Sequence, residues 1–121
     1  MKTIMLVDDA VTVLLAVSSI LAKAGYVVIQ ANTAADGLTR LRAGPSIDLL
    51  ITDFNMPDMD DIDFIKEVRK LPDHKFMPIL FLTTESQQAA REKARDAGAS
   101  GWIVKPTTTV ELLETVKLVI K

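Results

Sequence analysis

Short apolar runs recur along the chain, and each is followed by a segment in which apolar residues repeat with helical spacing. Five of these runs are rich in valine, isoleucine and leucine, and we interpret them as strands. They lie at residues 4–7, 27–29, 49–51, 79–82 and 102–104. A strand that is apolar at consecutive positions is buried on both faces, as in a parallel sheet covered by helices. The alternation therefore predicts an α/β fold with right-handed crossovers.

The helical segments are delimited by residues that start or stop helices. The first, at about residues 10–24, ends at Gly25, which suits a helix C-terminus. Its predicted inward-facing stripe consists of Val13, Ala16, Val17, Ile20 and Ala24. The fourth, at about residues 87–97, is rich in alanine and poor in large apolar residues. The last opens with Thr108-x-x-Glu111, which is the spacing of a capping box.

The composition narrows the class of protein and its location. A chain of 121 residues has the size of one domain, and we expect a single domain over residues 1–121. The net charge of −2 and the lack of a basic run argue against a nucleic-acid or membrane surface. There are no cysteines, which excludes disulfides and thiolate metal sites. The longest apolar stretch is too short and too polar to span a bilayer, so we expect a cytoplasmic protein.

Charged and hydroxyl side chains follow four of the five predicted strands. Asp8-Asp9 follow the first strand, Asp53 the third, Thr83 the fourth and Lys105 the fifth. The carboxyl ends of parallel strands meet at one edge of a sheet, where α/β folds bind ligands, so we expect these residues to converge. Three carboxylates held close together repel one another. At least one of them would therefore take up a proton unless a cation is present, either a bound divalent ion or the Lys105 ammonium.

The residue types at this edge favour a hard metal ion and phosphoryl chemistry. These motifs contain no histidine or cysteine, so a metal would have only oxygen ligands, which favours Mg²⁺, with Mn²⁺ as the alternative. A carboxylate beside such an ion is suited to attack on phosphorus, which gives an acyl phosphate. Asp53, at the end of a buried strand, is the first candidate. Lys105 would neutralise the oxygens of the transferring group, and Thr83 would donate a hydrogen bond to one of them.

The combined pattern resembles a known family. Its motifs are Asp8-Asp9, Asp53-x-x-Met56-Pro57, Thr83 and Lys105-Pro106. Together they resemble the receiver domains of two-component response regulators, above all the free-standing chemotaxis type, and the resemblance covers the whole chain. It implies a flavodoxin-like (βα)5 fold, a doubly wound five-stranded parallel sheet with strand order 2-1-3-4-5.

The resemblance also implies a role for each residue at the predicted sheet edge. Asp53 is the phosphoacceptor, and the donor is a histidine kinase or a histidine phosphotransfer protein. Asp9 is a direct Mg²⁺ ligand, Asp8 an indirect one, and Asp53 with the backbone carbonyl of Asn55 completes the protein ligands. Lys105 binds the phosphoryl group. No enzymatic activity is expected beyond autocatalytic phosphoryl acceptance and slow self-dephosphorylation.

The family's switch and docking positions imply how the signal enters and leaves the domain. Thr83 is the switch hydroxyl, and Trp102 stands where the family usually has a switch tyrosine or phenylalanine. Leu14 and Leu15 stand where charged residues are common, and we expect this extra apolar surface, chiefly Leu14, to dock the kinase. Asp61 replaces a usual glycine. The output partner is an unidentified protein target, and we expect a monomer or weak dimer.

Three other functions share part of this sequence pattern. A haloacid-dehalogenase-like phosphatase also uses a strand-end aspartate, but it usually carries a second aspartate two residues later, where this chain has Asn55. A receiver fragment of a longer DNA-binding regulator would have the same sequence. An interaction module that has lost phosphorylation conflicts with the complete set of site residues.

Two further features have structural interpretations. Acidic residues between the third strand and the third helix are interpreted as favouring the start of that helix. They are Asp58, Asp60, Asp61 and Asp63. His74, the only histidine in the sequence, is interpreted as a solvated loop residue.

Overall fold

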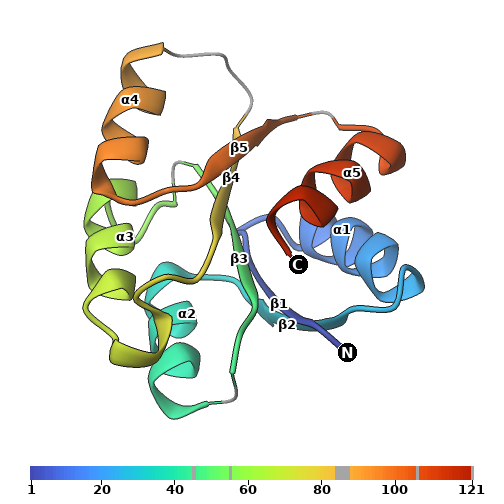
Figure 1. The fold of residues 1–121 in the computed structure, drawn as a ribbon, viewed down its shortest axis with the longest axis horizontal. Coiled ribbons are helices and arrows are strands. Elements are labelled where there is room, and N and C mark those ends of the chain that lie inside the picture. Colours follow the sequence, from blue (N-terminus) through green and yellow to red (C-terminus); the bar gives the residue numbers. More distant parts are fainter. Residues whose placement is uncertain (45, 55, 84–87, 106, 121) are drawn as a thin grey trace.

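Strands and helices alternate along the whole described part of the chain (Figure 1). The computed structural model describes residues 1–44, 46–54, 56–83, 88–105 and 107–120. Within these residues the elements are β1 (Thr3–Val7), α1 (Val11–Lys23), β2 (Val27–Ala31), α2 (Ala34–Ala43), β3 (Leu49–Asp53), α3 (Asp61–Arg69), the 3-10 turn η1 (Pro72–His74), β4 (Ile79–Thr83), α4 (Gln88–Ala97), β5 (Gly101–Val104) and α5 (Thr109–Val119). No helix in these ranges is long and apolar enough to cross a membrane.

The strands form one parallel sheet in the order β2-β1-β3-β4-β5, which confirms the predicted fold and strand order. From β1 the chain crosses to β2 on one side, and from β3 it continues to β4 and β5 on the other. The direction of winding therefore reverses between β1 and β3. In open α/β sheets, ligands bind beyond the carboxyl ends of the strands at such a reversal.

Two apolar clusters cover the two faces of the sheet. α1 and α5 lie on one face and α2, α3 and α4 on the other (Figure 1). Successive residues of a strand point to opposite faces: in β1, Ile4 and Leu6 join the α1–α5 cluster, whereas Met5 and Val7 join the α2–α4 cluster. All four side chains are fully buried. The sheet is therefore enclosed on both sides, which holds its carboxyl edge in a defined geometry.

The buried face of α1 differs from the predicted stripe. Leu14, Val17 and Leu21 are buried, whereas Ala16 and Ala24 are exposed. Leu14 is only 5% exposed, so the prediction that it forms the chief docking surface was wrong. A leucine side chain buries far more apolar area than an alanine side chain, so packing favours the rotation of the helix that buries the leucines.

The loop after β3 is connected to two helices. Asp60 caps α3, where its carboxylate accepts hydrogen bonds from two amides of the first turn at 3.0 and 3.2 Å. Asp58 caps a different helix: its two oxygens accept from the amides of Ala34 (3.1 Å) and Ala35 (3.0 Å) at the start of α2. The interpretation that Asp58 serves α3 was therefore wrong. The predicted cap of α5 is confirmed, since Thr108 accepts from the Glu111 amide at 3.1 Å.

His74 is buried, which contradicts its interpretation as a solvated loop residue. It is 3% exposed at the end of η1, and neither ring nitrogen has a hydrogen-bond partner among the residues described. Its carbonyl accepts from the Arg69 guanidinium at 3.1 Å. The same guanidinium also donates to the carbonyls of Met77 and Gly98. Arg69 thus ties the turn before β4 to the end of α4.

We expect His74 to make the free energy of unfolding depend on pH. Burial lowers the pKa of its imidazole, although the charge of Asp73 opposes this. In the unfolded chain the imidazole titrates near pH 6.5, so below about this pH the unfolded state binds more protons and stability is lost. Urea unfolding at about pH 7.5 and about pH 5.5 should show a smaller loss in His74→Phe than in the wild type. Equal losses would contradict the prediction.

Candidate functional site

The sheet brings the predicted strand-end residues together at its carboxyl edge. The Asp8 amide donates to the Ala31 carbonyl at 3.1 Å, which extends the pairing of β1 with β2 by one residue. Asp53 is the last residue of β3 and is paired in register with Leu82 of β4. The Lys105 amide donates to the Thr83 carbonyl at 2.6 Å just beyond β5. Backbone hydrogen bonds of the sheet therefore set the positions of the site residues.

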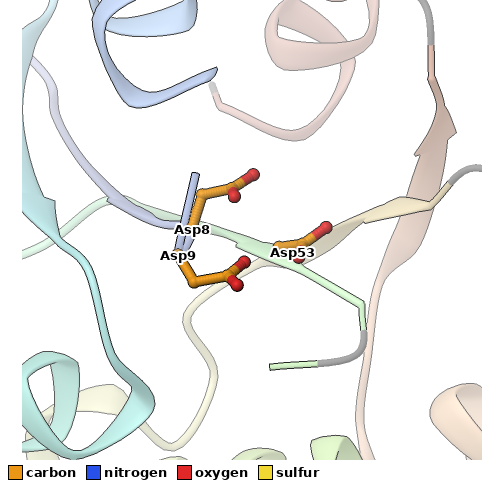
Figure 2. Close-up of side chains that lie close together, drawn as sticks. All are labelled: Asp8, Asp9 and Asp53. Carbon is orange, nitrogen blue, oxygen red and sulfur yellow. The ribbon is translucent and has the colours of Figure 1, made fainter. Parts of the chain in front are cut away.

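Three carboxylates form a cluster at this edge. Asp8, Asp9 and Asp53 each place a carboxylate oxygen within 4.8 Å of the others, and Figure 2 shows the three side chains side by side. Asp8 is fully buried and Asp53 is 9% exposed, whereas Asp9 is exposed to solvent. Asp9 is therefore the carboxylate of the cluster that is most accessible to a ligand from solution.

Lys105 bridges the two buried carboxylates. Its Nζ lies 2.6 Å from Asp53 Oδ1 and 3.3 Å from Asp8 Oδ2. The other oxygen of Asp8, Oδ1, accepts from the Ala10 amide at 2.9 Å. Both oxygens of Asp8 therefore have partners. Among the described residues, the Asp9 carboxylate has no hydrogen-bond partner, so its oxygens can face an ion.

The proximity of these charges shifts two pKa values. Burial raises the pKa of the Asp53 carboxyl, and the negative charges of Asp8 and Asp9 add to this effect, while the hydrogen bond from Lys105 opposes it. Burial alone would lower the pKa of the Lys105 ammonium, but its hydrogen bonds and charge interactions with Asp53 and Asp8 raise it above the usual value. Lys105 is therefore firmly cationic, and the site favours additional positive charge.

The switch residues predicted from the family pattern lie on β4 and β5. Thr83 ends β4 and is partly buried. Trp102 is partly buried on β5 and packs against the apolar cluster on the α2–α4 face. The structure places Asp8, Asp9, Asp53 and Lys105 in one site; Asn55 lies outside the described residues.

One residue at this end of the molecule was not predicted. The guanidinium carbon of Arg91 on α4 lies 4.4 Å from the ring centroid of Trp102 on β5, which is a cation–π contact. No local sequence pattern indicates such a pair, because the two residues belong to different elements.

An apolar groove runs between α1 and α5 and ends at the site. Its walls include Val13, Ala16 and Ile20 of α1 and Leu112 of α5, and Lys105 lines it too. On the outer surface of α1, Val11 and Leu15 are each 61% exposed. Apolar surface therefore leads from α1 to the carboxylate cluster.

Known proteins share the sequence pattern over most of the chain. Residues 4–117 match the family model of the response regulator receiver domain. Chemotaxis protein CheY1 of Helicobacter pylori is 35% identical over 118 residues, which cover 97% of this chain and 95% of that protein. Chemotaxis protein CheY-3 of Vibrio cholerae is 38% identical over 114 residues, which cover 92% and 85%.

Solved structures agree with this assignment. The structure of chemotaxis protein CheY4 of Vibrio cholerae matches with a TM-score of 0.94 and 37% identity over 99% of both chains. The receiver domain of sensor histidine kinase PA1611 of Pseudomonas aeruginosa, whose structure has a magnesium ion in the active-site cleft, matches in fold with a TM-score of 0.88 at 23% identity over 98% of this chain and 96% of that one. Because the family model spans most of the chain and relatives exceed 30% identity, the chain belongs to the response regulator receiver domain family.

Proposed function

We propose that this receiver is a signalling switch in which Asp53 accepts a phosphoryl group from the phosphohistidine of a kinase or phosphotransfer protein. A carboxylate oxygen of Asp53 attacks phosphorus, the phosphorus–nitrogen bond breaks, and the imidazole leaves with the electron pair. The observation that carries the proposal is the position of Lys105 Nζ, 2.6 Å from Asp53 Oδ1 and within reach of Asp8. A cation held beside the nucleophile can neutralise the charge on the transferring group.

The residues of the cluster fit a hard divalent ion, Mg²⁺ or Mn²⁺. Their donors are carboxylate oxygens, and they lie close enough together to share one ion. Asp9 and Asp53 would be direct ligands, together with the Asn55 carbonyl that the family pattern implies. Asp8 would act indirectly, because its oxygens already bond to Lys105 and to the Ala10 amide. When bound, the ion would add positive charge beside the phosphoryl oxygens.

The output is expected from the α4–β5–α5 face. On phosphorylation, the Thr83 hydroxyl moves toward a phosphoryl oxygen and Trp102 turns inward into the space beside β5. The change in shape alters the affinity of this face for a protein target. The two states differ by only a few kcal/mol, so phosphorylation shifts a population that already exists.

Mass spectrometry tests the proposed acceptor directly. The protein is incubated with acetyl phosphate and Mg²⁺, and its mass should rise by one phosphoryl group that hydroxylamine removes, as expected of an acyl phosphate. Peptide mapping should place the group on Asp53, and a chelator should slow its formation severely. Hydroxylamine-stable phosphate on Thr83, with none on Asp53, would overturn the mechanism. The phosphatase alternative is not favoured, because the family match covers residues 4–117.

We expect Asp9→Ala to weaken Mg²⁺ binding more than Asp8→Ala does. Loss of Asp8 removes a supporting group, and such a loss typically lowers metal affinity by about tenfold or more. Loss of Asp9 removes a direct ligand and should lower the affinity further. Calorimetric titration with Mg²⁺ measures the affinity of each variant. Asp73→Ala, in the turn η1, is the control for the loss of one negative charge. An Asp9→Ala protein that binds Mg²⁺ as tightly as the wild type would contradict the ligand assignment.

We expect Leu15→Arg to slow phosphoryl transfer from the cognate phosphodonor protein by about tenfold, as for loss of an interface anchor. Leu15 and Val11 form exposed apolar surface on the helix that follows the carboxylate pair. Labelling by acetyl phosphate should be unchanged, because that donor needs no docking surface. Leu118→Arg is the matched control, since Leu118 is 74% exposed at the end of α5 remote from the site. Equal transfer rates in both variants and the wild type would exclude docking on α1.

A further inference from the structure

Trp102 is covered by a charged side chain from the neighbouring helix. The Arg91 guanidinium carbon lies 4.4 Å from the centroid of the Trp102 ring, and both residues are partly buried. An arginine at this distance is attracted by the negative face of the indole. The guanidinium is planar and can stack on the ring as well as attract it. The contact therefore favours one orientation of the indole.

We propose that Arg91 is a positioning residue that holds Trp102 in its resting orientation and so sets how readily the domain switches. The inference rests on the proposed function, because it assigns the control of the same switch. Before Trp102 can turn inward, its ring has to leave the guanidinium. The stack therefore stabilises the resting state relative to the active one.

The position of Arg91 on α4 lets this contact attach the helix to β5. The end of α4 is held separately, since the Arg69 guanidinium donates to the Gly98 carbonyl at 2.6 Å. Arg91 lies about 10 Å from that end, at 1.5 Å of rise per helical residue. Ala94, between them, is 2% exposed, but an alanine buries little apolar area. The stack on β5 is thus an additional attachment of α4, at the part of the helix farther from the Arg69 anchor.

Loss of the stack should shift the balance between the two states. A cation–π contact at a partly exposed site changes such an equilibrium by about two- to fivefold. Arg91→Gln should therefore switch at a lower concentration of an activating ligand. Arg91→Lys should give an intermediate effect, because an ammonium keeps the charge but lacks the planar surface.

Quenching of Trp102 fluorescence tests the resting state, since Trp102 is the only tryptophan. Acrylamide is a neutral quencher, so a change in charge does not itself alter its access to the indole. In the metal-free protein the resting state remains the major one after a shift of about two- to fivefold, so loss of the covering guanidinium should make Trp102 more accessible in Arg91→Gln than in the wild type. Arg95→Gln is the matched control, because the Arg95 side chain is 69% exposed on the same helix and lies 3.8 Å from Asp96. Equal accessibility in Arg91→Gln and the wild type overturns the inference.

A titration with beryllofluoride, a phosphoryl mimic, tests the effect on switching in the presence of Mg²⁺. The half-saturating concentration, read from Trp102 fluorescence, should fall about two- to fivefold in Arg91→Gln and stay at the wild-type value in Arg95→Gln. An unchanged value in Arg91→Gln overturns the inference. A wild-type protein that takes phosphate on Asp53 with no change in fluorescence also overturns it, together with the proposed movement of Trp102, and leaves the proposed phosphoryl acceptance by Asp53 standing. Failure of the proposed function is separate: no acyl phosphate forms on Asp53 in the mass assay.

Discussion

Asp53→Asn should take up no phosphoryl group under conditions in which the wild type takes up one. An amide oxygen is neutral and a poor nucleophile, whereas in the proposed mechanism the charged carboxylate of Asp53 attacks phosphorus. The substitution keeps the size and shape of the side chain at a position that is 9% exposed. Intact-mass measurement after incubation with acetyl phosphate and Mg²⁺ gives the result directly. Labelling of Asp53→Asn at the wild-type level would exclude Asp53 as the acceptor.

The same substitution should also raise stability when no metal is present. Burial and the charge of Asp8 raise the pKa of the Asp53 carboxyl, so its ionised form is disfavoured in the folded state. The folded state then binds protons more tightly than the unfolded chain does. The free energy of unfolding therefore falls as the pH rises from the pKa of the Asp53 carboxyl in the unfolded chain through its higher pKa in the folded state. Asp53→Asn removes that penalty and should unfold at a higher urea concentration than the wild type in chelator.

A carboxylate at the opposite end of β3 provides the comparison. Asp48 Oδ2 accepts a hydrogen bond from the Thr3 amide at 2.7 Å, and it lies just before β3 instead of at its carboxyl end. Asp48→Asn should therefore lower stability or leave it unchanged, and it should leave phosphorylation intact. A gain in stability for Asp48→Asn equal to that of Asp53→Asn would show that the effect is not specific to the site.

The architecture and the position of the site follow from local patterns in the sequence. Consecutive apolar residues identify strands that are buried on both faces, and a parallel sheet places all their carboxyl ends at one edge. For this reason Asp8, Asp53 and Lys105 could be predicted to meet although they are far apart in the chain. Their distinct environments could not be predicted: adjacent aspartates look alike in sequence, yet Asp8 is fully buried and Asp9 is exposed.

Packing between elements accounts for the predictions that were wrong. α1 is apolar at so many positions that more than one stripe is compatible with its sequence, and only contact with the sheet selects Leu14 over Ala16. Asp58 caps a helix that lies before it in the chain, and the short turn that buries His74 has no periodic pattern. Such non-local contacts are not encoded in residue spacing.

Lys105→Ala should separate phosphorylation from output. The ammonium of Lys105 is the point charge shared by Asp53 and Asp8, and by the proposed mechanism it contacts the phosphoryl group once Asp53 is modified. Without it, the phosphoryl oxygens lose a partner that holds the active arrangement together. The proposed carboxylate ligands remain, so Mg²⁺ binding should be retained and acetyl phosphate should still label the protein, at a lower rate.

Three measurements on one sample define the expected result for Lys105→Ala. Calorimetry should show Mg²⁺ binding, intact mass should show the acyl phosphate, and the accessibility of Trp102 to acrylamide should stay at its resting value. Lys105→Arg keeps the charge but replaces a compact ammonium with a planar guanidinium, so it should restore only part of the change in Trp102 accessibility. A Lys105→Ala protein whose Trp102 responds to phosphorylation as in the wild type would show that Thr83 alone carries the signal from Asp53. Lys105 would then serve only to neutralise the two buried carboxylates.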